Sequence, residues 1–89
     1  MIDHLGFSVQ DHAASKAFYL KALAPLGISV VMEVPKAVTG HSSDHTGLGA
    51  AGKPFFWISE GKAASSMHLC LVAETRAAVD GFHKAALGA

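Results

Sequence analysis

The sequence predicts an α+β fold in which a β-α-β-β-β module is followed by the β-α start of a second module. Three observations support this prediction. About half of the 89 residues are apolar and 16% are charged, which is typical of a small globular domain and not of a disordered chain. Along the chain, the alternation expected of strands changes repeatedly to the three- and four-residue spacing of helices. The sequence also matches itself at an offset of 64 residues.

The first expected elements are a strand, a helix and a second strand. Apolar residues alternate with polar or small ones in Ile2–Val9, which indicates a strand. Helical spacing follows over His12–Leu26, with Asp11 as a suitable N-cap and Gly27 as a suitable residue after the helix end. The β-branched residues of Ile28–Val34 predict the second strand.

The rest of the chain predicts three further strands and one further helix. Residues 36–46 are rich in Gly, Ser, Asp and His and indicate a loop. The expected elements after it are strands at Thr46–Ala51, Phe55–Ser59 and Met67–Ala73, and a helix at Arg76–Leu87. Thr75 is a suitable N-cap for that helix.

The internal repeat predicts how the chain is organised. An offset of 64 residues places His4 on His68, Phe18 on Phe82 and Leu23 on Leu87. Seven pairs are identical, of which three are alanines and carry little weight in an alanine-rich chain. We therefore expect residues 1–63 to form the first β-α-β-β-β module. Residues 64–89 are expected to form the first strand and helix of a second module, truncated because the chain is shorter than two such units.

Charge and hydropathy exclude several kinds of partner. Seven basic side chains balance seven acidic ones, which argues against a nucleic-acid surface or a polybasic membrane patch. Apolar runs fall well short of the roughly 18 residues that a membrane span needs. No basic segment leads into an apolar one at the N-terminus, and the single cysteine has no internal disulfide partner. These features favour the cytoplasm.

Two of the six histidines occupy equivalent positions in the repeat. His4 shares strand parity with Gly6 and Ser8, and His68 shares it with Cys70, so each lies opposite the main apolar stripe of its strand. Neutral imidazoles are good ligands for a divalent metal. Alternatively, both histidines are hydrogen-bonded polar residues of a cavity wall. Cys70 is expected to be an inert thiol, since no cationic residue can be placed beside it.

Aromatic residues and a second histidine group give weaker indications. Strict alternation places Phe55 and Trp57 on one face, where they would form an aromatic wall suited to a flat apolar ligand. His41, His45 and Asp44 fall in the predicted loop. A solvated loop is the main expectation for them, and a lid over the cavity is the alternative.

The order of elements and several segments resemble the vicinal oxygen chelate superfamily of glyoxalases, bleomycin resistance proteins and extradiol dioxygenases. The resembling segments are distributed along the chain from one end to the other: Ile2–Val9, Phe18–Gly27, Phe56–Ile58, Met67–Leu69 and Arg76–His83. The resemblance implies an incomplete barrel of mixed β-sheet with helices outside, formed when two modules pair, and a metal site in its mouth. It also implies a homodimer.

In function, the resemblance implies a metal-dependent lyase or dioxygenase, an oxidoreductase in the latter case, acting on a small molecule with vicinal oxygens. Its divalent Zn, Ni, Fe or Mn would be bound by His4 and His68. The family's first-module carboxylate aligns with Trp57, so Glu60 could serve only if the strand bends. The pocket would include Ser8, Phe55, Trp57 and Cys70, and no catalytic residue can be assigned. The alternatives are a metal-free small-molecule binding or resistance protein on the same fold, and part of a domain that is inactive by itself.

Overall fold

The computed structural model describes residues 1–40 and 43–89. Its secondary structure is β1 (Leu5–Val9), α1 (His12–Leu23), the 3-10 turn η1 (Ala24–Leu26), β2 (Ser29–Val34), α2 (Lys36–Thr39), β3 (His45–Ala50), β4 (Lys53–Glu60) and α3 (Arg76–Gly88). The fold class is α+β, as the sequence predicts. Among the described residues, no helix is both long enough and apolar enough to cross a membrane.

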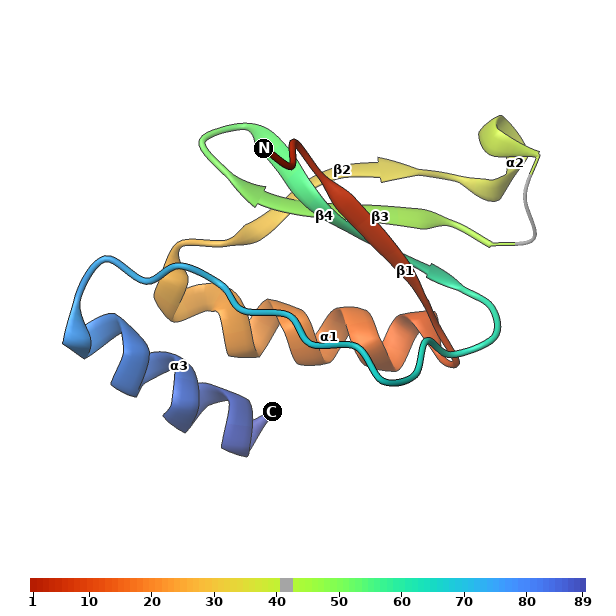
Figure 1. The fold of residues 1–89 in the computed structure, drawn as a ribbon. Coiled ribbons are helices and arrows are strands. Elements are labelled where there is room, and N and C mark those ends of the chain that lie inside the picture. The colour runs from red at the N-terminus through yellow and green to blue at the C-terminus, as the bar shows by residue number, and fades with distance from the viewer. Residues whose placement is uncertain (41–42) are drawn as a thin grey trace.

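The four strands form one mixed sheet in the order β1-β4-β3-β2. β1 and β4 run parallel, whereas β4, β3 and β2 are successive antiparallel neighbours. The sheet does not close into a barrel. Helix α1 lies along one side of it, and the chain after β4 runs back along α1 to reach α3 (Figure 1).

The predicted caps determine where the helices begin. The Asp11 carboxylate accepts a hydrogen bond from the Ala14 amide at 3.0 Å, and the Thr75 hydroxyl accepts one from the Ala78 amide at 3.1 Å. Both caps satisfy an amide that the first helical turn leaves unpaired. Gly27 follows η1 with a φ of 74°, a left-handed conformation that glycine adopts without strain.

The core lies between the sheet and α1. Its most deeply buried side chains are Leu23 of α1 and Leu48, Phe56 and Ile58 of the two central strands. The Tyr19 ring meets Phe56 edge to face, with centroids 5.1 Å apart. Burial of these side chains accounts for the apolar alternation in the strand sequences.

The prediction of a fifth strand at Met67–Ala73 is wrong. This segment, called the strap here, forms no strand. A strand needs the backbone of a neighbour to pair with, and no backbone hydrogen bond in the described residues joins the strap to a strand. Leu69 and Leu71 instead pack on the core, so the apolar residues of the strap are used without a sheet.

Candidate functional site

The two faces of the sheet differ sharply. The covered face, against α1, carries the buried side chains of β3 and β4. The open face carries the alternate positions of the same strands. Along one row of the sheet, Gly6 of β1 aligns with Trp57 of β4, and Trp57 aligns with Gly47 of β3.

Trp57 forms the floor of the open face because its neighbours have no side chains. A Cβ added to Gly47 would lie 2.9 Å from the Trp57 ring, which shows that the indole lies directly over this glycine. A Cβ on Gly6 would come 3.4 Å from the Trp57 Cβ. The open face there is a shallow hollow of about 440 Å³, lined by His4, Gly6, Val34, His45 and Trp57.

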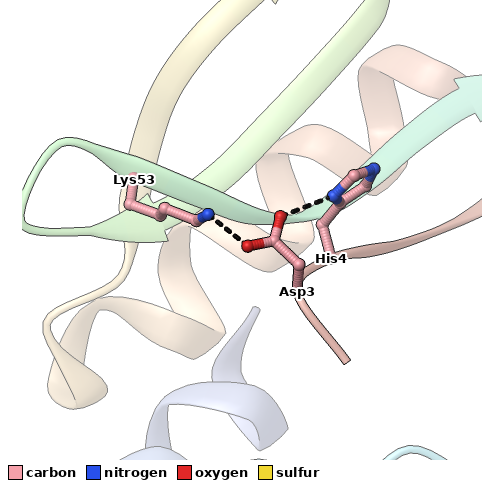
Figure 2. A network of polar contacts seen from close by, with 3 residues as sticks. All are labelled: Asp3, His4 and Lys53. Atoms are coloured by element: carbon pink, nitrogen blue, oxygen red, sulfur yellow. Dashed lines mark hydrogen bonds and ion pairs between the residues drawn. The ribbon is translucent and has the colours of Figure 1, made fainter. Parts of the chain in front are cut away.

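Two histidines therefore border the indole. His4 comes just before β1, and its Nδ1 lies 2.8 Å from Asp3 Oδ2. Asp3 is in turn paired with the Lys53 ammonium, so the carboxylate lies between an imidazole and an amine (Figure 2). Bonding to Lys53, and then to His4, lowers the pKa of the Asp3 carboxyl. The ionised carboxylate holds the His4 ring at Nδ1.

His45 lines this hollow from a strand, whereas the sequence predicted a solvated loop, with a lid over the cavity as the alternative. It was expected in a loop with Asp44 and His41, but it is the first residue of β3. Its parity with Gly47 was the signal that could have found it. Asp44 has a structural contact, since its carboxylate accepts a hydrogen bond from the Lys36 amide at 2.9 Å. His41 lies outside the described residues.

Phe55 and Trp57 do not share a face of the sheet in the structure. A register shift in the β3–β4 pairing between Leu48 and Gly49 interrupts the alternation on which their shared face depended. Phe55 packs against the core and borders a crevice with Leu5 and Leu26, whereas Trp57 stays on the open face. The expected wall of two aromatic rings is therefore a single indole.

The other predicted residues do not join His4 in this hollow. His68 and Cys70 are exposed residues of the strap, which lies beside α1 on the covered side of the sheet. Ser8 lies against the turn after β4, where a Cβ on Gly61 would come 3.2 Å from its hydroxyl oxygen. Glu60 borders a separate polar pocket with His12 and Asp44. Within the described ranges, no three His, Cys, Asp or Glu residues are grouped to bind a metal ion.

A polar cluster links α1 to the sheet on the covered side. The His12 Nε2 lies 2.7 Å from the hydroxyl of Thr46, which is fully buried. That hydroxyl also donates a hydrogen bond to Glu33 at 3.2 Å, and Glu33 pairs with Lys16 at 2.5 Å. Thr46 is thus satisfied on both sides, as a buried hydroxyl must be.

Comparison with known proteins adds no family assignment. A scan against family models found no match to this chain, and a search of curated proteins found no match either.

Proposed function

We propose that this protein binds a small molecule with a flat, partly apolar body that stacks on Trp57 in the open-face hollow. The observation that carries the proposal is the row Gly6–Trp57–Gly47, which exposes an indole face between two residues without side chains. A flat ring gains from burial and from offset stacking on an indole. The imidazoles of His4 and His45 line the same hollow and supply polar groups for the rim of the ligand.

Fluorescence titration tests this proposal directly, because Trp57 is the only tryptophan in the chain. Catechol is a suitable probe, since it combines a flat ring with two adjacent oxygens. We expect saturable quenching of Trp57 in the wild-type protein. The Trp57→Phe variant, followed by NMR, should retain weakened binding, and Trp57→Ala should lose it.

Phe18→Ala provides the matched control for the loss of an aromatic ring. Phe18 is a partly exposed aromatic residue of α1 that borders a different cavity, so this variant should bind catechol like the wild type. Non-saturable quenching, or equal binding by Trp57→Ala, would contradict the proposal.

A metal-dependent lyase or dioxygenase is the second candidate, and one contact favours it. Metal-binding histidines commonly donate their other ring nitrogen to a carboxylate, which is how Asp3 holds His4. The described residues do not complete a metal site, because His68 and Glu60 lie apart from His4 in separate surroundings. The missing ligands would have to come from substrate, water or a second copy of the chain.

We also propose a homodimer, because a second copy could supply the missing metal ligands and because β1 pairs with a strand on one side only. Sedimentation of the full chain measures the association, and a monomer at all concentrations would contradict it.

Elemental analysis of the protein after loading with Zn, Ni, Fe or Mn tests whether it binds a metal ion. His4→Ala should lose stoichiometric binding, whereas His83→Ala, on exposed α3, should keep it. Retention of full metal content by His68→Ala would remove His68 from the ligand set. We place the protein in the cytoplasm, which its single free Cys70 favours.

A further inference from the structure

The surface of the molecule is hollowed at the end of the sheet near η1. A crevice of about 600 Å³ lies there between the sheet, η1 and the strap. Its wall is mainly apolar and includes Leu5, Leu26, Ile28, Phe55, Leu69 and Leu71. The volume is in the range of small-molecule sites, and an apolar wall of this kind favours an apolar body.

A single charge borders this crevice. Glu74, the residue after the strap, is the only charged residue that lines it in the described part of the chain. Its carboxylate forms no ion pair with a described residue, and it is exposed at the surface. A ligand with an apolar body and a cationic group would satisfy both features, because the carboxylate attracts a positive charge at the point where the apolar wall ends.

The strap that closes the crevice is held by packing alone. No described backbone hydrogen bond connects Met67–Ala73 to the sheet or to a helix. Leu69 and Leu71 provide its contacts with the core. A segment with few backbone bonds opens at lower cost than the strands beside it, which allows a ligand to enter.

From these contacts we propose a second binding site, in the crevice under the strap, for a small organic amine with an apolar body of about the size of a bicyclic ring. The ring lies among Leu26, Phe55 and Leu69, and the ammonium lies beside the Glu74 carboxylate. The site is on the covered side of the sheet and does not include Trp57. It is therefore independent of the function proposed for the open face.

A matched pair of probes tests the charge preference. 1-Naphthylmethylamine is a cation at pH 7, and 1-naphthylacetate carries the same ring with an anionic group. We expect saturable amide shifts in Leu26 and in Leu69–Leu71 when the ¹⁵N-labelled full chain is titrated. At low salt, the cation should bind about three- to fivefold more tightly than the anion, as is typical of an exposed ion pair.

Two classes of variant distinguish the contribution of the Glu74 charge from that of apolar packing in the crevice. Glu74→Gln should abolish the preference for the cation, whereas Glu60→Gln, a carboxylate on β4 outside the crevice, should keep it. Ala50→Phe, which fills the rim of the crevice, should weaken both probes at least fivefold. Leu26→Trp serves the same purpose if that variant does not fold.

The proposal is overturned by equal affinities for the two probes, by an unchanged preference in Glu74→Gln, or by shifts confined to the open face. It is also overturned if neither probe binds. Trp57→Ala should bind 1-naphthylmethylamine like the wild type. Failure at one site can thus be distinguished from failure at the other.

Discussion

The covered and open faces of one sheet come from the same strands, yet they have different properties. Neighbouring residues of β4 show this most clearly: Phe56 is fully buried against Tyr19, whereas Trp57 lies on the other face over Gly47. Side chains on the covered face have several contacts from α1 and the central strands. Trp57 rests on a glycine and meets solvent. The covered face therefore contributes most of the stability of the fold. The open face is where we propose that a ligand binds.

The largest difference in the free energy of unfolding is expected between two variants that each remove one aromatic ring, one from each face. Phe56→Ala leaves a cavity in the core, so we expect it to lower the free energy of unfolding by about 3–5 kcal/mol. Trp57→Ala removes a partly exposed ring, and we expect a loss of about 1 kcal/mol. Urea unfolding followed by circular dichroism measures both. Phe56→Leu provides a milder variant if Phe56→Ala does not fold, and equal losses on the two faces would contradict the distinction.

The buried hydroxyl of Thr46 should give the next largest effect on the covered face. Thr46→Val keeps the shape but leaves His12 and Glu33 without their shared partner, which should cost about 1–3 kcal/mol. Thr46→Ser keeps the hydroxyl and should lose less. Thermal unfolding of the two variants gives the comparison. A valine variant as stable as the wild type would show that the cluster does not stabilise the link between α1 and the sheet.

The burial of Tyr19 on the covered face can be tested by a pH titration. Burial raises the pKa of the Tyr19 hydroxyl above its usual value, so the neutral form is favoured in the folded state. The resulting stability is fully present below about pH 10 and is lost as pH rises through the folded-state pKa. Tyr19 is the only tyrosine, so tyrosinate absorbance reports it alone. Titration at an ordinary pKa in the folded protein would contradict this assignment.

The smallest effect is expected at the edge of the open face. Replacing Lys53 by Met removes the main cause of the lowered Asp3 pKa, which should rise toward 3.8. In the wild type, the stability that this carboxylate contributes is present above its unfolded-state pKa and is lost as pH falls through its lowered folded-state pKa. Carbon-detected NMR titration of Asp3 measures the change. Lys62→Met is the matched control and should leave the Asp3 titration unchanged.

Much of the fold could be predicted because local signals agreed. Asp11 and Thr75 cap the helices for which they were predicted, and the strand alternation matches the two faces of the sheet. The strap shows where local pattern is insufficient. Its alternation is that of a strand, but a strand exists only if a neighbouring backbone pairs with it.

The candidate site was predicted only in part. Parity placed His4 opposite the apolar stripe of its strand, the resemblance placed Trp57 in the pocket, and both border the open hollow. His68 was expected there through the repeat, which assumed a second sheet-forming strand. Phe55 was expected beside Trp57 by strict alternation, which the register shift at Leu48 and Gly49 interrupts. His45 was expected in a loop because its strand begins one residue before the predicted one.

The sequence by itself determined the helix caps, the apolar stripes and the alternating faces, since these depend on residues close together in the chain. Only the tertiary structure decided which strands pair, where the register shifts, and that the strap packs without joining the sheet. Those outcomes depend on contacts between distant segments, and no local pattern encodes them. The same contacts separate His4 from His68 and leave Trp57 on an open face.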